Sequence, residues 1–214
     1  MSIRALLSIP DNGYAAKNKQ VLARKWQAVE KTRNKGTILA MNNEKRNTDS
    51  WYMMRALEQA KQAFALDEVP IGALVVDEHG VILGAGFNTT EHDCSQASHA
   101  ELKALQRAGQ QKKDWRLDGA TLFVTLEPCV MCVGAARLSR IGRIVFGAES
   151  PLFGFRLDND LGLWLYNKDA MVIQGGVEHK ACSLILKEFF QQKRKKGEWK
   201  KNGKGYGEDK SGPS

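Results

Sequence analysis

A pair of cysteines at metal-binding spacing is the feature of this sequence best suited to chemistry. Cys129 and Cys132 follow Pro128, with two residues between them. The mainly apolar residues 121–126 predict a strand before them, and residues 133–138 predict a helix after them. The cysteines are therefore expected on the first turn of that helix, where both sulfur atoms can face one metal ion. The unpaired N–H groups and the dipole of a helix N-terminus favour the thiolate form that binds metal.

His99 can supply a third ligand. Together with the two cysteines it would leave a fourth coordination position for water, which is the arrangement of a catalytic zinc ion; structural zinc sites usually have four protein ligands. Glu101 lies two residues after His99, and two positions along an ideal helix point about 200° apart. Glu101 can thus reach the open side of the metal only if this pair lies where the chain enters the helix predicted over Ala97–Ala108. Small residues on both sides of His99 permit that.

The order His-x-Glu followed by Pro-Cys-x-x-Cys is the pattern of the zinc-dependent nucleobase deaminases. Over about residues 51–194 the chain resembles the bacterial tRNA-specific adenosine deaminases. The ordered set of motifs is far more specific than any one of them. The motifs that carry the resemblance are Val69-Pro70-Ile71-Gly72-Ala73, Gly86-Phe87-Asn88, His99-Ala100-Glu101, Val124–Cys132 and Ser139–Gly147.

The resemblance implies an activity and a set of site residues. The activity is hydrolytic deamination of adenosine to inosine at the wobble position of a tRNA anticodon, with release of ammonia. One Zn²⁺ per subunit would be held by His99, Cys129 and Cys132, while Glu101 would be the catalytic residue that carries protons. Asn88 and Ala100 would contact the substrate. The final helix would offer the anticodon stem-loop four residues: Phe189, Phe190, Lys193 and Arg194.

The loop before His99 departs from the family pattern. Where the family usually carries Asp-Pro and a small residue, this chain has Ser95-Gln96-Ala97-Ser98, although the eleven-residue interval from Asn88 to His99 is kept. The alternative role for Asn88 is a cap at the strand end or turn. By residue type alone, the rival metal ligands are His79, His92 and Cys94.

Positive charge is concentrated at the two ends of the chain, whose net charge is +8. Residues 1–50 carry ten Lys and Arg against four Asp and Glu, and residues 191–214 carry eight against three, whereas the residues between them carry 14 against 17. Such ends suit a polyanionic partner, although charged termini are also common as solvated tails. The same two interpretations, nucleic acid or solvent, hold for Arg137, Arg140 and Arg143.

The apolar patterns predict an α/β three-layer α/β/α sandwich with a mixed five-stranded sheet. The resemblance implies the cytidine-deaminase-like version of this fold, commonly a homodimer. Ser50 is the expected N-cap of the first helix, and residues 151–167 predict a structured loop near the pocket or a dimer partner. Strands are predicted over residues 71–76, 81–87, 120–126, 144–147 and 171–174, and helices over residues 51–64, 97–108, 133–138 and 178–195.

The pattern divides the chain into three parts. Residues 1–48 are expected to form a basic, disordered extension with a short helix over Val21–Lys31, residues 49–196 the zinc-dependent deaminase domain, and residues 197–214 a disordered basic tail. The extension lacks an apolar signal core and is not Ser-rich, so organelle targeting is not expected. No run approaches the roughly 18 apolar residues of a membrane span. Four cysteines without a disulfide framework indicate a reducing compartment, and we expect a cytoplasmic protein.

Three other functions share parts of this pattern. A deaminase of a free base or nucleoside, such as guanine or cytosine, has the same zinc signature, but the basic tail and the close match over Pro128–Cys132 speak against it. A noncatalytic zinc module could bind RNA. A redox Cys-x-x-Cys protein would also place its motif before a helix, but it would leave His99 and Glu101 unexplained.

Overall fold

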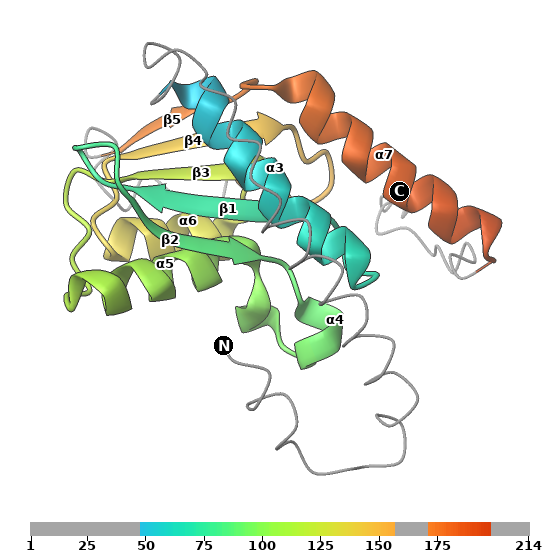
Figure 1. The fold of residues 1–214 in the computed structure, drawn as a ribbon, viewed down its shortest axis with the longest axis horizontal. Coiled ribbons are helices and arrows are strands. Elements are labelled where there is room, and N and C mark those ends of the chain that lie inside the picture. Colours follow the sequence, from blue (N-terminus) through green and yellow to red (C-terminus); the bar gives the residue numbers. More distant parts are fainter. Residues whose placement is uncertain (1–47, 157–170, 198–214) are drawn as a thin grey trace, which may run out of the picture. The chain divides into compact units, whose positions relative to one another are not determined.

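The structure is a computed structural model that describes residues 48–156 and 171–197 (Figure 1). All of these residues lie within one unit of the chain, residues 44–214. The predicted N-terminal extension, with its short helix, and the predicted C-terminal tail lie almost entirely outside the described residues. The same holds for residues 157–167 of the loop predicted after the fourth strand.

A mixed five-stranded sheet forms the centre of this unit, in the order β2-β1-β3-β4-β5. β1 is antiparallel to both β2 and β3, while β3, β4 and β5 run parallel to one another. The sequence prediction of a mixed sheet of five strands is confirmed. The strands are β1 (Gly72–Val76), β2 (Ile82–Phe87), β3 (Thr121–Leu126), β4 (Arg143–Ala148) and β5 (Val172–Gln174).

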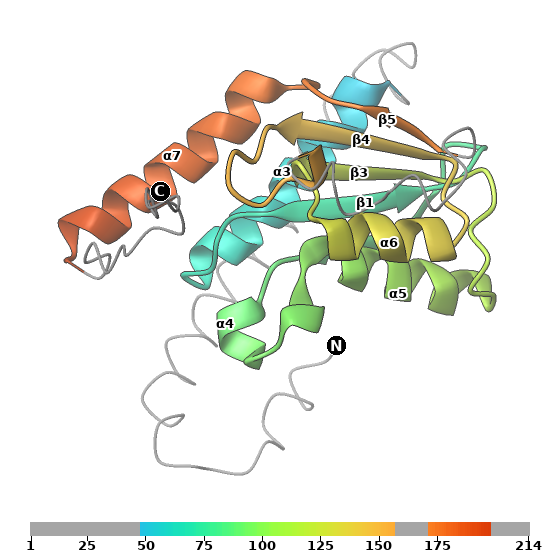
Figure 2. The same cartoon turned by 180° about the vertical axis from the view of Figure 1, so that it is seen from behind.

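Helices cover both faces of the sheet and complete the predicted three layers (Figures 1 and 2). α5 (Ala100–Lys112) and α6 (Val130–Leu138) lie on one face, and α3 (Asp49–Ala65) and α7 (His179–Lys195) lie on the other. Side chains alternate between the two faces along each strand. On β3, for example, Leu122 and Val124 join the core under α5 and α6, while Phe123 joins the core under α3 and α7.

Strand direction brings the predicted site residues to one edge of the sheet. β2 and β3 point the same way because both are antiparallel to β1. The C-terminal ends of β2, β3 and β4 therefore meet at this edge, together with the N-terminal end of β1. Ligands of open α/β sheets bind outside the C-terminal ends of strands. Asn88 and the Pro128–Cys132 segment follow directly from β2 and β3, so the topology alone gathers them.

Two predicted helix starts are corrected by the structure. The first helix, α3, begins at Asp49, and its N-cap is Thr48 rather than Ser50: Thr48 is extended, and its side chain accepts a hydrogen bond from the Trp51 amide at 3.2 Å. The second, α5, begins at Ala100 rather than at Ala97. His99 has an extended backbone (φ −61°, ψ 147°) that interrupts the helix, and the residues before it form α4 (Thr90–Asp93) and the short 3₁₀ helix η2 (Gln96–Ser98).

Among the described residues, no helix combines the length and the apolar character that crossing a membrane requires.

Close packing of α5 on β2 gives a stability prediction. A Cβ atom on Gly84 would lie 2.2 Å from the Ala104 carbonyl oxygen and 2.6 Å from the Ala108 amide nitrogen. These are backbone atoms, so α5 itself would have to move. We expect Gly84→Ala to lower the free energy of unfolding by about 3 kcal/mol, the upper end for overpacking, as measured by urea denaturation.

Gly134 in α6 is the matched control. A Cβ atom there would meet nothing within 4 Å, and alanine is favoured over glycine within a helix by about 1 kcal/mol. Gly134→Ala should therefore leave stability unchanged or raise it. Equal losses of stability in the two variants would contradict the close contact of β2 with α5.

Candidate metal centre and active site

The starts of two helices present the three predicted metal ligands. His99 is the N-cap residue of α5, and Cys129 is the N-cap residue of α6, with an extended backbone (φ −75°, ψ 167°). Cys132 lies in the first turn of α6 and is fully buried. The strand, turn and helix predicted around the cysteines are thus present, and they end at the sheet edge where β3 finishes.

The distances between the donor atoms fit a zinc ion. His99 Nδ1 lies 3.8 Å from Cys129 Sγ and 3.4 Å from Cys132 Sγ, and all three donor atoms lie within 4.8 Å of one another. Tetrahedral zinc has bonds of about 2.3 Å to sulfur and about 2.1 Å to nitrogen, which separates such ligand atoms by about 3.6 Å. One imidazole and two thiolates also match the donor types that zinc prefers, so these residues could hold it with one position left open.

Electrostatics at the donor atoms favour a bound cation. A hydrogen bond from the Cys132 thiol, followed by one from His99, lowers the pKa of Cys129 to about 4 despite its burial. The same cysteine pair raises the pKa of Cys132, as do burial and the nearby Glu101 carboxyl. The hydrogen bond to Cys129 raises the pKa of His99. Metal binds thiolate and neutral imidazole and displaces their protons, so a cation would replace the shared protons.

Glu101 lies beside the ligand group. It is the second residue of α5 and is 4% exposed. Its carboxyl interacts with the Cys132 thiol by a hydrogen bond, and burial raises its pKa. His99 and Glu101 occupy the entry of the helix, which is the position that their two-residue spacing requires if both are to face one ion.

The three residues that could rival these metal ligands by residue type do not join the group of His99, Cys129 and Cys132. His79 pairs with Glu78 in the exposed β1–β2 turn at 3.6 Å, and the His92 ring contacts Asp93 at 2.8 Å. Cys94 is exposed. Within residues 48–156 and 171–197, the group of His, Cys and acidic side chains close enough to share an ion is that of His99, Cys129 and Cys132.

Asn88 and Ala100, the two predicted substrate contacts, are both buried. Asn88 is 5% exposed, and its side-chain amide is already hydrogen-bonded within the protein: Nδ2 lies 3.3 Å from Glu68 Oε2, and Oδ1 accepts from the Thr90 hydroxyl at 2.7 Å. Ala100 is fully buried, with its methyl group in the core under α5. Sequence reasoning missed Glu68, because its partner Asn88 lies 20 residues away.

Asp93 organises the loop that departs from the family pattern. Its Oδ2 atom accepts hydrogen bonds from the Thr89 hydroxyl at 2.5 Å, the Ser98 hydroxyl at 2.7 Å and the Lys103 ammonium at 2.9 Å. Burial opposes the charged form, but these hydrogen bonds outweigh it and the pKa of Asp93 is well below its ordinary value. One carboxylate thus ties both ends of the 89–98 loop to α5, next to the candidate ligand His99.

An ion pair between the buried Glu127 carboxylate and the exposed Arg156 side chain holds the segment after β4 against the cysteine turn. Glu127 is 5% exposed, and its carboxylate accepts from Arg156 Nε at 2.8 Å, Arg156 Nη2 at 3.0 Å and the Ser150 amide at 3.0 Å. A Cβ atom on Gly154 would lie 2.5 Å from the Glu127 carboxyl carbon, so the close approach requires glycine. The Phe155 amide donates to the Pro128 carbonyl at 2.9 Å. Residues 149–156 are therefore held against Glu127 and Pro128, the two residues that precede Cys129.

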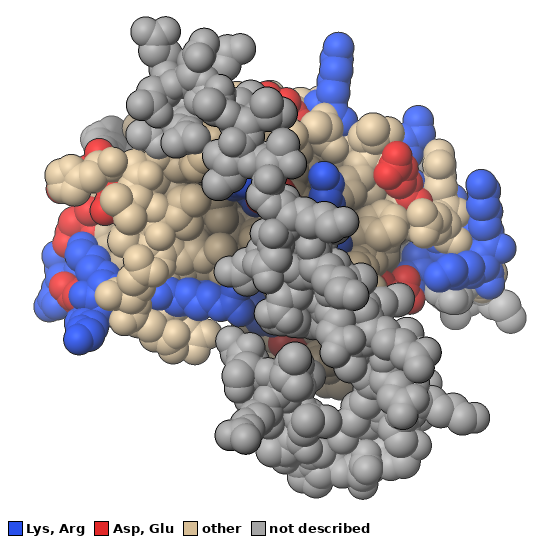
Figure 3. Space-filling model, viewed as in Figure 1, with Lys and Arg blue, Asp and Glu red and all other residues tan. Residues whose placement is uncertain are grey.

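The four predicted RNA contacts lie at the C-terminal end of α7, where the figure shows Lys and Arg side chains (Figure 3). Phe189 is 4% exposed because its ring packs against Phe64 at 5.6 Å, so it belongs to the contact between α3 and α7 rather than to the outer surface. Phe190 is partly buried beside it. Lys193 forms an ion pair with Asp67 at 2.6 Å, while Arg194 is exposed.

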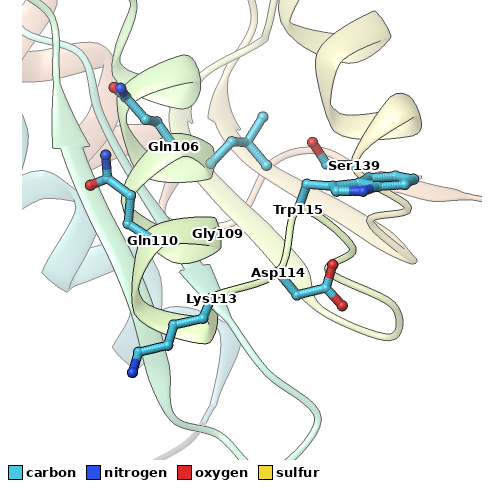
Figure 4. Close-up of a pocket in the computed structure, with 8 residues that line it drawn as sticks. Gln106, Gly109, Gln110, Lys113, Asp114, Trp115 and Ser139 are labelled. Atoms are coloured by element: carbon cyan, nitrogen blue, oxygen red, sulfur yellow. The ribbon is translucent and has the colours of Figure 1, made fainter.

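Two of the three arginines left open by the sequence, Arg143 and Arg140, differ in their surroundings. Arg143 forms a two-pronged ion pair with Asp49 at 2.8 and 2.5 Å and also contacts Gln174, so it joins β4 to α3 and β5. Arg140 lies 3.7 Å from Asp118 and over the Trp115 ring. An open cavity of about 510 Å³ adjoins this tryptophan, at the C-terminal end of α5 and away from the metal ligands (Figure 4).

Comparison with known proteins assigns this fold and site to a class. Residues 46–194 match the family described as MafB19-like deaminase. A guanine deaminase from Nitrosomonas europaea shares the fold, with a TM-score of 0.57 at 23% identity over 73% of this chain and 97% of its own. The chain is therefore a deaminase.

Proteins with higher sequence identity identify the family within this class. The tRNA-specific adenosine deaminase of Bacillus subtilis (strain 168) is 42% identical over 150 residues, which are 69% of this chain and 92% of that protein. A structure from a study of A-to-I editing by tRNA deaminases at the wobble position matches 63% of this chain and 97% of its own, with 32% identity and a TM-score of 0.57. This chain belongs to the tRNA-specific adenosine deaminase family.

Proposed function

We propose that the chain catalyses the hydrolytic deamination of adenosine to inosine at the wobble position of a tRNA anticodon, with release of ammonia. The observation that carries this proposal is the buried Glu101 carboxyl beside the group of His99, Cys129 and Cys132. The activities named for the B. subtilis relative and the wobble-editing structure support the choice of substrate.

The site residues divide the chemistry between them. His99, Cys129 and Cys132 would hold zinc, which when bound makes water acidic enough to act as a nucleophile near neutral pH. Glu101 moves the protons: its carboxylate takes one proton from the attacking water and delivers it to the purine ring. It then takes the remaining proton from the hydroxyl group added at C6 and passes it to the amino group, which leaves as ammonia while the C6 carbonyl of inosine forms. A raised pKa suits this role, because proton transfer is most effective when the pKa of the group lies close to the working pH.

Access to the reacting carbon selects the substrate. The C6 atom of adenosine cannot be reached in a stacked base, so the nucleotide must be turned out of its stack, which costs least in a single-stranded loop. An anticodon loop meets this need. The net charge of +8, and the Lys and Arg residues of the last turn of α7, suit a tRNA phosphate backbone. Asn88 is proposed to contact the nucleoside.

We propose a homodimer in the cytoplasm, where its tRNA substrate would be found. Met131 and Leu138 on α6 are 42% and 67% exposed, and a second copy would cover such apolar side chains. Size-exclusion chromatography with light scattering tests the dimer.

Parallel assays with alternative substrates test the function. The chain, loaded with zinc, is incubated with an anticodon stem-loop carrying adenosine at the wobble position, and separately with guanine and cytosine. We expect the stem-loop to react, because its adenosine can be turned out of the loop. Hydrolytic deamination should then release one ammonia for each inosine formed. Ammonia released only from a free base would replace this proposal with a free-base deaminase, and RNA binding without ammonia would indicate a noncatalytic module.

A further inference from the structure

A buried carboxylate outside the ligand group is hydrogen-bonded to Asn88, the predicted substrate contact. Glu68 lies in the turn between α3 and β1 and is 2% exposed. Its oxygens accept hydrogen bonds from Asn88 Nδ2 at 3.3 Å, the Glu91 amide at 3.3 Å and the His92 amide at 2.6 Å. Burying a polar group is costly unless hydrogen bonds compensate it. These three N–H groups supply that compensation, and all belong to the segment that starts at the end of β2.

The carboxylate decides which end of the Asn88 amide faces it. An ionised carboxylate only accepts hydrogen bonds, whereas an asparagine side chain has an NH₂ donor and an oxygen acceptor. Nδ2 must therefore point toward Glu68. The NH₂ group has two hydrogens, so Nδ2 can donate both to Glu68 Oε2 at 3.3 Å and to the Val69 carbonyl at 3.4 Å. At the other end, Oδ1 accepts from the Thr90 hydroxyl at 2.7 Å. A carbonyl oxygen has two lone pairs, so Oδ1 is the atom of this amide with capacity left for substrate.

We propose that Glu68 is a positioning residue of the deaminase, which fixes the Asn88 amide so that its oxygen accepts a hydrogen bond from a donor of the substrate nucleoside. The proposal rests on the proposed function and on the proposed contact of Asn88. The donor is a ribose hydroxyl or an N–H of the base. Glu68 acts on binding through Asn88 and takes no part in proton transfer.

A double-mutant cycle tests the proposal. Glu68→Gln keeps the side-chain volume but places an NH₂ group among donors, and Asn88→Ala removes the contact itself. We expect Glu68→Gln to raise KM about tenfold, the effect of losing one hydrogen bond to a charged group, with kcat and zinc content close to those of the wild-type chain. In the Asn88→Ala background the same substitution should change KM little, because residues that act through one another are not additive.

Two outcomes overturn the proposal. One is an equal effect of Glu68→Gln with and without Asn88, which would mean that Glu68 acts independently. The other is a loss of thermal stability with unchanged KM, which would make Glu68 only a folding residue. Should Glu68→Gln not fold, the cycle is repeated with Glu68→Asp, which retains the acceptor but shortens the side chain and should raise KM by less than about tenfold. Glu58→Gln, an exposed carboxylate on α3, is the control and should leave KM unchanged.

The measurement also separates this proposal from the proposed function. The cycle is run on whichever substrate, the stem-loop or a free base, the wild-type chain deaminates. Turnover of a free base alone overturns the proposed function but still allows the coupling between Glu68 and Asn88 to be measured. A zinc-loaded wild-type chain that turns over neither substrate overturns both.

Discussion

Glu101→Gln is expected to abolish inosine formation while the chain keeps one zinc ion. Glutamine has the volume of glutamate but cannot carry a proton between water, ring nitrogen and leaving amine. Proton transfer by a positioned side chain contributes about 10²–10⁴-fold to rate, and here one group serves every transfer, so we expect kcat to fall at least about 10³-fold. Because Glu101 lies beside the donor group rather than in it, zinc content measured by mass spectrometry should not change.

Glu78→Gln provides the matched control. This carboxylate lies in the β1–β2 turn and its side chain is 70% exposed, so the substitution removes the same charge without touching the site. Its kcat should equal that of the wild-type chain. Wild-type turnover in Glu101→Gln would remove Glu101 from the reaction, whereas simultaneous loss of zinc would show that it supports the metal rather than moving protons.

The grouping of the three candidate metal ligands was predictable because their signal is local. Cys129 and Cys132 lie three positions apart after a strand, and His99 and Glu101 two positions apart at the start of a helix, so spacing and secondary structure together restrict their geometry. The same reasoning anticipated that Glu101 could face the ligands only at a helix entry. The exact start of α5 was not predictable, because the extended backbone of His99 is set by the loop before it rather than by helix propensity.

The residues that support the ligands were not predictable, because their contacts are long-range. Glu127 was visible in the motif, but its partner Arg156 lies 29 residues later. Glu68 and Asn88 are 20 residues apart and meet only because β1 and β2 are neighbours. Apolar periodicity correctly predicted the last helix as amphipathic, yet it could not tell which of two adjacent aromatic rings would be buried. The structure buries Phe189 against α3.

The altered loop before His99 shows how a different sequence can hold the same geometry. The usual Asp-Pro is absent, and Asp93 lies two residues earlier than the family aspartate. Its carboxylate nevertheless bonds Ser98, next to His99, and Lys103 on α5. The eleven-residue interval is therefore maintained by side-chain hydrogen bonds. This explains why the motif positions on either side of the loop remain in place although the residues between them differ.

Cys129→Ser is expected to release zinc and, with it, activity. Serine oxygen is a poor substitute for a thiolate, and Cys129 is the thiol whose pKa is lowered to about 4, chiefly by its hydrogen bond from Cys132. Loss of residues that only support a ligand weakens metal binding about 10–100-fold, so loss of the ligand itself should weaken it at least about 100-fold. Zinc bound only by the folded chain also raises Tm. A chelator should therefore lower Tm in the wild-type chain but not in Cys129→Ser.

Cys94→Ser separates the ligand role from the chemistry of thiols in general. Cys94 is exposed and lies in the loop before His99, so it is the cysteine nearest in sequence to the third ligand and a rival by residue type. This variant should keep its zinc, its chelator response and its turnover. The opposite pattern, with zinc retained by Cys129→Ser and lost by Cys94→Ser, would require a rearranged 89–98 loop at the metal. That rearrangement would break the hydrogen bonds of Asp93, so an intact loop and a Cys94 ligand exclude each other.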